Sequence, residues 1–373
     1  MSRIFYSVQG EGRGHATRVR AVIEELRSNH EITVYASNQA YALLASVYHR
    51  SEVKVHRIPG FFNYYTSKTG LDYVRTGFYG LSFLAYLPRL IQELQHDIDS
   101  EKPDLAITDY EPALPRAAAR CGIPFISLNH QHFLLTYDLS SLPSFLRRHA
   151  AFMAQIVRSC YSGQVETVVS SFYFPPLKSG VEKVTQIGVL LRPEIICADP
   201  SSGSHLVVYI RRNATQSLLD ALQGAGCEVR IYGLGARPSM KNLRFHAVDA
   251  FRFVEDLASS RALICTAGNQ LVGEALYLGK AVLAIPEKNN YEQYINAHFL
   301  QESGAGMTVE LDDIASSHVR TFCDKLDIFG QKIDRKRQYG NPVAKAIIQK
   351  YLNKDMVDER SKISDSSRVE VTA

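Results

Sequence analysis

The sequence has no long uninterrupted hydrophobic run, no paired cysteines and no strong charge of either sign. Its longest apolar region, residues 71–91, contains Asp72, Arg75, Pro88 and Arg89, which exclude a membrane-spanning helix there. The six cysteines are scattered without a C-x-x-C pair, which argues against a disulfide framework and a zinc site. The formal net charge of +4 is too small to indicate nucleic-acid binding. No basic segment followed by an apolar core opens the chain, so we expect a cytoplasmic protein.

Length and composition indicate a globular chain with room for two domains. Hydrophobic residues make up 46% and charged residues 21% of the 373 residues. Residues 192–205 hold two prolines, three serines and a glycine, which is the composition of an interdomain linker. We therefore expect domains over 1–191 and 206–340, a helix over 341–353 and a disordered tail over 354–373. Whether that helix packs back on the first domain stays open.

Short β-branched and aromatic runs alternate with helical patterns along the whole length. In the first half, strands are predicted near Ile4–Val8, Ile32–Ala36, Val53–Ile58, Leu105–Thr108, Phe125–Asn129, Thr167–Phe172 and Val184–Gly188. In the second half they are predicted near Leu206–Ile210, Glu228–Tyr232, Leu243–Val248, Ala262–Thr266, Ala281–Pro286 and Met307–Leu311. The alternation predicts an α/β fold of two doubly wound, Rossmann-like parallel-sheet domains that face a cleft.

The first motif is GEGRGHATR, residues 10–18, which joins the first predicted strand to a helix. Gly10, Gly12 and Gly14 allow the backbone to bend sharply and to approach a ligand closely. His15 then stands at the start of the helix, at the carboxyl edge of the sheet, where an imidazole can act as a base. The alternative is a tight strand-to-helix turn with an exposed histidine.

The second motif covers residues 265–297, where an apolar strand, a turn at Gly268 and a helix from Asn269 follow one another. The first amides of such a helix are unpaired and form an anion site suited to a diphosphate. Glu274 lies about one and a half turns into the helix, where its carboxylate can accept both hydroxyls of a ribose. A solvated helix face is the alternative for Glu274. The polar segment 287–293 suits sugar hydroxyls.

Together the two motifs resemble those of the GT-B glycosyltransferases. The similarity is to the branch near the lipid-linked N-acetylglucosaminyltransferase of peptidoglycan synthesis and the UDP-glycosyltransferases. The opening G-x-G-x-G-H-x-x-R is also similar to that of a poorly characterised bacterial and archaeal group in this branch. The resemblance spans roughly residues 1–350 and is strongest over 8–18 and 262–297. It implies a GT-B fold with an acceptor-binding N-terminal domain and a C-terminal domain that binds a nucleotide sugar.

The resemblance also implies roles for individual residues. His15 matches the general base of the family, and Asp109 falls where UDP-glycosyltransferases place an aspartate that orients the histidine. An aspartate is equally common as a turn residue at a strand end, so that alternative stays open. The acceptor or phosphate loop is expected to contain Gly10, Gly12, Gly14 and Arg18. The nucleotide-sugar site is expected to contain Arg211, Asn213, Val248, Phe251, Gly268, Asn269, Gln270, Glu274, Glu292 and Gln293.

The chain departs from the family after strand 206–210, where the peptidoglycan enzyme has a glycine-rich turn. Here the sequence reads Arg211-Arg212-Asn213, so phosphate contacts are expected from arginine forks and the next helix start. The base-binding loop falls around residues 248–251, and the preference for uracil follows only from the resemblance.

Two further patterns bear on metals and on the acceptor. Asp97-x-Asp99 lies in a predicted helix and not at a strand end, and the two histidines of residues 129–132, NHQH, lack a third ligand, so no metal is expected. The aromatic region of Phe61, Phe62, Tyr64, Tyr65 and residues 78–86 is read either as buried core or as an acceptor surface facing lipid or sugar. Arg147, Arg148 and His149 on a nearby segment favour the second reading.

These implications define the expected function. It is inverting, metal-independent transfer of a sugar from a nucleotide sugar, with UDP as the nucleotide, to a hydroxyl acceptor. The acceptor candidates include lipid-linked and cell-envelope glycans, which leaves peripheral membrane association open. No cofactor beyond the donor substrate and no nucleic-acid partner is expected. The alternatives are a nucleotide-sugar hydrolase of the pseudaminic-acid-pathway type and a non-catalytic nucleotide-sugar-binding protein. A UDP-sugar 2-epimerase needs more acid/base groups than the motifs offer.

Overall fold

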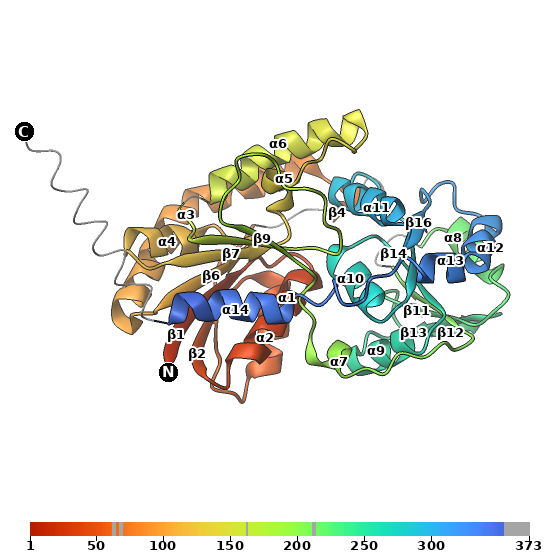
Figure 1. The fold of residues 1–373 in the computed structure, drawn as a ribbon, viewed down its shortest axis with the longest axis horizontal. Helices are drawn as coiled ribbons and strands as arrows, with labels where there is room; N and C mark the ends of the chain where they lie inside the picture. Colours follow the sequence, from red (N-terminus) through yellow and green to blue (C-terminus); the bar gives the residue numbers. More distant parts are fainter. Residues whose placement is uncertain (62–64, 67–69, 162, 211–213, 354–373) are drawn as a thin grey trace, which may run out of the picture.

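The computed structural model describes residues 1–61, 65–66, 70–161, 163–210 and 214–353. Over these residues the chain forms two seven-stranded sheets in succession, each mostly parallel and covered by helices, together with a short two-stranded hairpin (Figure 1). This arrangement confirms the predicted α/β class with two doubly wound sheets. The predicted disordered tail, 354–373, lies outside the described residues.

The first sheet has the strand order β3-β2-β1-β6-β7-β8-β9, and all of its pairings are parallel. Its strands are β1 (Ser2–Val8), β2 (His30–Ala36), β3 (Lys54–Arg57), β6 (Leu105–Asp109), β7 (Phe125–Asn129), β8 (Glu166–Ser170) and β9 (Val184–Ile187). Its helices are α1 (Arg13–Leu26), α2 (Asn38–Tyr48), α3 (Tyr73–Glu101), α4 (Ala113–Arg120), α5 (Phe133–Thr136) and α6 (Ser144–Cys160). The hairpin of β4 (Tyr65–Thr66) and β5 (Gly70–Leu71) precedes α3.

Alternating side chains of the first sheet enter two separate cores because neighbouring residues of a strand point to opposite faces. Ile4, Tyr6 and Val8 of β1 pack with α1 and α2, whereas Phe5 packs with α3 and α4 on the other face. Burial on both faces accounts for the nearly continuous apolar runs in these strands, as expected for a parallel sheet.

The second sheet has the order β12-β13-β11-β10-β14-β15-β16, in which β12 alone pairs antiparallel. Its strands are β10 (Leu206–Tyr209), β11 (Val229–Tyr232), β12 (Arg237–Met240), β13 (Leu243–His246), β14 (Ala262–Cys265), β15 (Ala281–Ala284) and β16 (Gly306–Thr308). The helices of this half are α7 (Pro193–Ile196), α8 (Gln216–Gln223), α9 (Ala250–Ala258), α10 (Asn269–Tyr277), α11 (Tyr291–Ser303), α12 (Ser316–Asp324) and α13 (Leu326–Gly330). The sequence pattern missed β12, because all four of its residues are exposed and carry no apolar alternation.

The last helix, α14 (Asn341–Leu352), returns to the first domain and lies beside α1 (Figure 1). Ala344, Ile348 and Leu352 enter the core formed by β1, α1 and α2. Asn341 is the first residue of the helix and not its cap, and its side chain bonds both the amide and the carbonyl of Leu191 at 2.7 and 2.8 Å. The chain therefore crosses between the domains twice, once in each direction.

The expected linker is bound to the second domain over its latter half. Lys280 Nζ donates to the carbonyls of Ser201 and Ser260, and the amide of Gly203 donates to Ser259. Burial lowers the pKa of Lys280 to about 8. The segment that connects the two domains is therefore shorter than residues 192–205, because Ser201 and Gly203 are already bonded to the second domain.

Both sheets reverse their strand order at one place, and the two reversals face each other. In the first sheet the chain moves outward from β1 to β3 and then resumes at β6 on the other side of β1. In the second sheet the same reversal separates β10 and β14. Ligands of open α/β sheets bind outside the carboxyl ends of the strands at such points. Both predicted motifs start at these strand ends, and α1 and α10 are in contact where the two domains meet (Figure 1).

Candidate functional site

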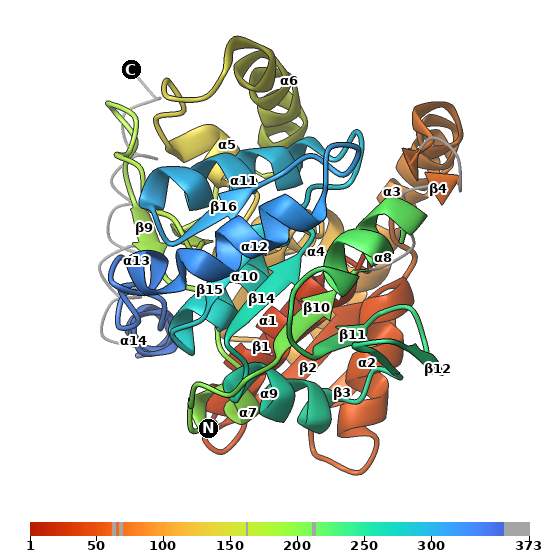
Figure 2. The same ribbon diagram turned by 90° about the vertical axis from the view of Figure 1, so that its right-hand side faces the viewer.

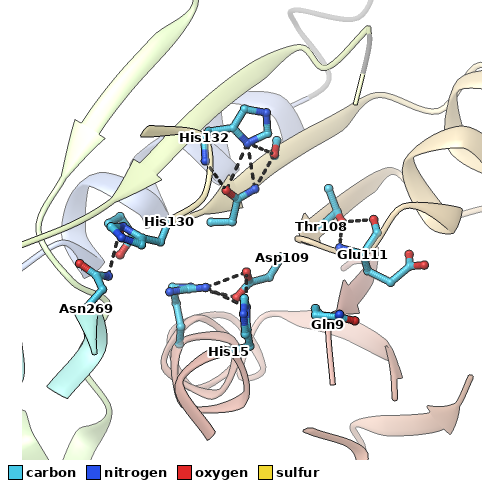
Figure 3. Close-up of polar contacts among 12 residues, drawn as sticks. Gln9, His15, Thr108, Asp109, Glu111, His130, His132 and Asn269 are labelled. Atoms are coloured by element: carbon cyan, nitrogen blue, oxygen red, sulfur yellow. Dashed lines mark hydrogen bonds and ion pairs between the residues drawn. The ribbon is translucent and has the colours of Figure 1, made fainter. Parts of the chain in front are cut away.

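The carboxyl ends of β1 and β6 bring His15, Arg18 and Asp109 into one polar cluster. His15 Nδ1 lies 3.0 Å from Asp109 Oδ1 (Figure 3). Arg18 donates from Nε to Asp109 Oδ2 at 2.9 Å and from Nη2 to Asp109 Oδ1 at 2.8 Å. Asp109 is fully buried and Arg18 nearly so, whereas the side chain of His15 remains 14% exposed. His15 is therefore the member of the cluster that a substrate can reach.

The charges in this cluster are balanced. Burial opposes ionisation of Asp109, but the charge of Arg18, the neighbouring His15 and their hydrogen bonds hold its pKa below the ordinary value. Burial acts to lower the pKa of Arg18, but the charge and hydrogen bonds of Asp109 raise it overall. Arg18 is thus a cation and Asp109 an anion, and the pair adds no net charge beside His15.

The turn after β6 holds Asp109 in place from the backbone. The amide of Gln9 donates to the Asp109 carbonyl at 2.9 Å, which continues the pairing of β1 with β6 beyond the last ladder residue. Tyr110 has a left-handed backbone with φ of 57°, and its ring stacks on that of His15 with centroids 6.3 Å apart. Glu111 accepts from two amides at the start of α4 at 2.7 and 2.9 Å and so caps that helix.

The glycines of the first motif have different structural roles. A Cβ on Gly10 would lie 2.4 Å from the Ser37 carbonyl oxygen, so the close approach of these two loops requires glycine. Gly12 adopts φ of 75° as the N-cap of α1. Gly14 lies inside the first turn of α1, where a Cβ would make an ordinary contact with Gln270 at 3.7 Å across the domain interface. The turn between β1 and α1 is therefore shorter than the motif, since α1 already begins at Arg13.

Arg18, expected in an acceptor or phosphate loop, lies instead in helix α1. Arg18 lies one turn into α1 beyond His15, and its guanidinium is buried against Asp109. A residue three positions after His15 shares its helix face, and that face points to β6. The motif alone could not separate these two orientations.

In the second motif, Ala267 and not Gly268 supplies the sharp turn. Ala267 has φ of 61°, and its carbonyl accepts a hydrogen bond from Asn296 Nδ2 at 2.9 Å. Gly268 has φ of −68° and caps α10, and a Cβ there would meet no atom within 4 Å. The amide of Val272 donates to the Gly268 carbonyl, so the amides of residues 269–271 precede the first helical hydrogen bond.

The side chains of Asn269 and Gln270 bind the first domain. Asn269 Nδ2 donates to the Ser170 carbonyl at 3.2 Å, and Asn269 Oδ1 accepts from the amide of Phe172 at 3.3 Å. Gln270 Nε2 donates to the Leu190 carbonyl at 2.8 Å. Both side chains therefore hold the start of α10 against the first domain.

Glu274 is buried in an ion pair that the sequence did not indicate. Arg192 donates to its two carboxylate oxygens from Nε at 3.3 Å and Nη2 at 3.1 Å, and Gln270 Nε2 donates to Oε1 at 3.1 Å. The Glu274 side chain is only 3% exposed. It is thus neither a solvated helix residue nor a free carboxylate that a ribose could bind as it stands.

Glu292 and Gln293, the expected sugar contacts, lie in the first turn of α11 and face different neighbours. The side chain of Glu292 is exposed. Desolvation by the surrounding protein raises its pKa, while nearby His15 and Arg18 and a hydrogen bond with Gln131 oppose that rise. Gln293 Oε1 accepts from the amide of Glu287 at 2.8 Å. Of the two, Glu292 is the one directed toward the first motif.

The expected base and phosphate contacts around β10 and β13 are only partly described. Val248, in the loop before α9, is 38% exposed, and Phe251, in the first turn of α9, is 67% exposed, so both present apolar surface to solvent. Arg211, Arg212 and Asn213 lie outside the described residues.

The histidines of residues 129–132 hold the domain interface and the loop after β7. His130 Nε2 lies 3.3 Å from Asn296 Oδ1 and Nδ1 lies 3.2 Å from the Ser170 carbonyl, so His130 links both domains. His132 Nδ1 lies 3.1 Å from Ser127 Oγ. Within the described part of the chain, no group of three or more His, Cys, Asp or Glu residues is arranged to hold a metal ion.

The predicted aromatic region is divided between surface and core: Phe83 and Tyr86 are half-buried against the core under α3 and α4, and much of the rest of α3 in this region is exposed. Phe62 and Tyr64 lie outside the described residues. On the first half of α3 the exposed apolar residues are Val74, Phe78, Tyr79, Leu81 and Leu84, with exposed fractions between 50% and 70%. On α6 they are Phe145, Phe152 and Ile156, and the neighbouring Arg147 and Arg148 are also exposed. In Figure 2, α6 projects at the top of the molecule and the start of α3, beside β4, projects at the upper right. No helix among the described residues is long and apolar enough to cross a membrane.

Sequence reasoning missed three residues that shape the site, namely Arg192, Gln131 and Asn296. Arg192 was placed in the linker, and its pairing with Glu274 depends on how the domains meet. Gln131 and Asn296 likewise act across the interface, on Glu292 and on His130. Contacts between residues more than 80 positions apart leave no local pattern in the chain.

Comparisons with known proteins agree with this architecture. The family model described as "Glycosyl transferase family 1" matches residues 2–327. A protein of Methanosarcina mazei described as an uncharacterized glycosyltransferase is 24% identical over 339 residues, which cover 82% of this chain and 84% of that protein.

Two solved structures have a similar fold. CalG4, the calicheamicin glycosyltransferase, has a TM-score of 0.69 at 18% identity, covering 95% of this chain and 99% of that one. LpCGTa in complex with UDP has a TM-score of 0.66 at 16% identity, covering 94% and 99% of the two chains. At this identity the likeness concerns the fold.

We predict that the interface loses stability in acid through His130. Burial, aided by the charge of Arg18, lowers the pKa of His130 to about 3, well below that of an unfolded chain. The unfolded state therefore binds more protons below about pH 6.5, and stability falls as the pH drops, by up to about 1.4 kcal/mol per pH unit. Between about pH 7 and pH 5, the melting temperature of His130→Gln should fall less steeply than that of the wild type. The exposed His49→Gln serves as control, and parallel curves for wild type and His130→Gln would contradict the prediction.

Proposed function

The chain belongs to glycosyl transferase family 1, and from that premise we propose an inverting, metal-independent transfer of a sugar from UDP to a hydroxyl acceptor. The resemblance to GT-B glycosyltransferases is confirmed by the family match and by the fold of the solved relatives. The observation that carries the finer proposal is the pairing of the partly exposed His15 with the buried Asp109, at the edge that faces the start of α10.

In the proposed mechanism His15 is the general base. With a proton on Nδ1 bonded to Asp109, the Nε2 lone pair is available to remove the proton of an acceptor hydroxyl. The acceptor oxygen then attacks the anomeric carbon from the face opposite the nucleotide, which leaves as a diphosphate. Asp109 stabilises the imidazolium that forms, as a carboxylate does in other nucleophile-activating pairs.

The donor diphosphate is proposed to lie at the start of α10. The amides of residues 269–271 and the helix dipole there offer donors and partial positive charge to the leaving group. Such preorganised donors can meet the developing charge without a metal. The UDP complex of LpCGTa supports UDP as the nucleotide. Glu274 can bind ribose hydroxyls in this arrangement only by exchanging its bond with Arg192 for them.

We predict that Gly268→Val abolishes UDP binding and leaves the fold intact. A Cβ at Gly268 meets no atom within 4 Å and its φ suits any residue, but a larger side chain would stand where the diphosphate approaches. UDP at a hundredfold excess over Kd should stabilise the wild type by about 2.7 kcal/mol. Thermal unfolding with and without UDP measures this gain, which the variant should lose.

Gly330→Val is the matched control for this experiment, because its Cβ also meets no atom within 4 Å and it lies at the end of α13. Equal melting temperatures without nucleotide would show that both variants fold. Equal stabilisation of Gly268→Val and wild type by UDP would refute the donor site.

We predict that His15→Ala lowers kcat by about 10²–10⁴-fold, the usual contribution of a general base. Its affinity for the UDP-sugar should stay near that of the wild type, because the base acts in the transition state. Asp109→Asn should lower kcat less, since the imidazole remains. Release of UDP from a panel of UDP-sugars and hydroxyl acceptors, measured in EDTA, together with donor titrations, tests both.

Three outcomes would count against parts of this proposal. Normal transfer by His15→Ala would leave His15 as a turn residue, and activity lost in EDTA and restored by metal would remove the metal-free mechanism. UDP release from the wild type at the same rate with and without any acceptor would instead favour a nucleotide-sugar hydrolase.

The acceptor is proposed to be lipid-linked and to be met at a membrane surface. Exposed aromatic and aliphatic side chains gather on the first half of α3 and on α6, and single proteins seldom expose so many without a partner. The exposed Arg147 and Arg148 on α6 suit anionic lipid headgroups. Both helices belong to the domain that carries His15.

We predict that the protein sediments with vesicles of phosphatidylglycerol and phosphatidylcholine, and less with phosphatidylcholine alone. The double variant Phe78→Ser/Phe152→Ser should lose most of this binding because it removes apolar contact from both helices. Ile328→Ser is the control, as Ile328 is 58% exposed on α13 of the other domain. Vesicle binding unaffected by the double variant would contradict the proposal.

A further inference from the structure

Arg18 occupies an unusual position for an arginine near a carboxylate and a base. Its side chain is only 4% exposed. Its guanidinium donates two hydrogen bonds to the carboxylate of Asp109, which also contacts His15. The guanidinium and the imidazole therefore contact the same carboxylate. This sharing links Arg18 to the proposed chemistry.

We propose that Arg18 is a positioning residue for His15, which clamps Asp109 in one orientation and keeps the imidazole neutral and ready to accept a proton. The inference rests on the proposed role of His15 as the base. It assigns to Arg18 a function inside the first domain, distinct from any contact with acceptor or phosphate.

The clamp follows from the geometry of the fork. Nε bonds Asp109 Oδ2 at 2.9 Å and Nη2 bonds Oδ1 at 2.8 Å, so the two parallel hydrogen bonds fix the carboxylate plane. His15 Nδ1 lies 3.0 Å from the same Oδ1. Because Arg18 and His15 are three residues apart on α1, one helix face presents both groups to β6. Lysine has a single ammonium and cannot reproduce this fork.

The clamp also bears on which ring nitrogen carries the proton. A guanidinium can only donate, and Arg18 Nη2 lies 3.0 Å from His15 Nδ1 as well as 2.8 Å from Asp109 Oδ1. If Nη2 serves Asp109, Nδ1 keeps its proton for the carboxylate and the Nε2 lone pair is available to a substrate. If Nη2 instead serves Nδ1, the proton moves to Nε2 and the ring cannot act as a base. The proposal requires the first state.

The second effect is electrostatic. Among the described residues, the charged or titratable groups that face His15 are Asp109 and Tyr110 from the β6 end, Arg18 from α1, His130 from the β7 end and Glu292 from α11. Arg18 balances the charge of Asp109, so the pair presents no net charge to His15. Without Arg18, the uncompensated Asp109 would favour the imidazolium, which is no base.

Histidine-ring NMR tests this directly and needs no substrate. In protein labelled with ¹⁵N-histidine, the signals of His15 are identified by their loss in His15→Gln. We expect the wild type to show the neutral ring with its proton on Nδ1. In Arg18→Met, His15 should bind a proton about tenfold or more tightly and titrate at correspondingly higher pH. The pH below which the transfer rate falls should rise by the same amount.

Two further variants keep the test decisive. Arg18→Lys should keep the titration near that of the wild type, because the charge remains, and should still lower kcat, because the fork is lost. The double variant Arg18→Met/Asp109→Asn removes both charges and should return the titration toward the wild type. Arg20→Met is the control. Arg20 lies on α1, like Arg18, and its substitution breaks the ion pair with Glu194 of α7, which should leave the titration of His15 unchanged.

An unchanged His15 titration in folded Arg18→Met, or a wild-type ring with its proton on Nε2, would overturn the inference. If Arg18→Met does not fold, Arg18→Lys decides the test. The inference would be overturned if His15 in Arg18→Lys titrated at a pH as high as that expected for Arg18→Met. These outcomes are separate from a failure of the proposed function, which would appear as normal transfer by His15→Ala whatever the NMR shows.

Discussion

The contact between the carboxyl edges of the two sheets is the constraint on which the site depends. Across this contact Asn269 bonds the Ser170 carbonyl, and His130 bonds Asn296. One apolar cluster also runs through it and includes residues of both domains, among them Phe133, Tyr173, Val272 and Phe299. Because the polar groups of the interface are buried, each needs its partner from the other domain. The relative placement of the two motifs is therefore specified by packing and hydrogen bonding together, and His15 faces the start of α10 as a result.

Much of the fold could be predicted from the chain because parallel strands buried on both faces leave continuous apolar runs. The thirteen strands expected from such runs all have counterparts, whereas the exposed β12 and the short hairpin β4–β5 were missed. The proximity of His15 and Asp109 was also within reach of the sequence, since both follow strands that meet at one sheet edge. Their register, Val8 opposite Asp109, makes that proximity a consequence of strand order.

What could not be predicted depends on side-chain direction and on long-range contacts. Arg18 shares a motif with the glycines, but the helix turns it toward β6. Glu274 sits where expected on α10, and a linker arginine covers its carboxylate. Gly268 was expected to make the turn that Ala267 makes with a left-handed backbone, held by a carbonyl bond to Asn296. In each case the deciding partner lies far away in the sequence.

The return of α14 to the first domain has a consequence for modularity. The first domain's core is completed by Ala344, Ile348 and Leu352, which the ribosome adds only after the whole second domain. The second domain is therefore an insertion within the first and not a module joined to its end. A chimaera that exchanges the second domain would have to be spliced at two points, near residues 192 and 340, because a single junction would leave one core without its last helix.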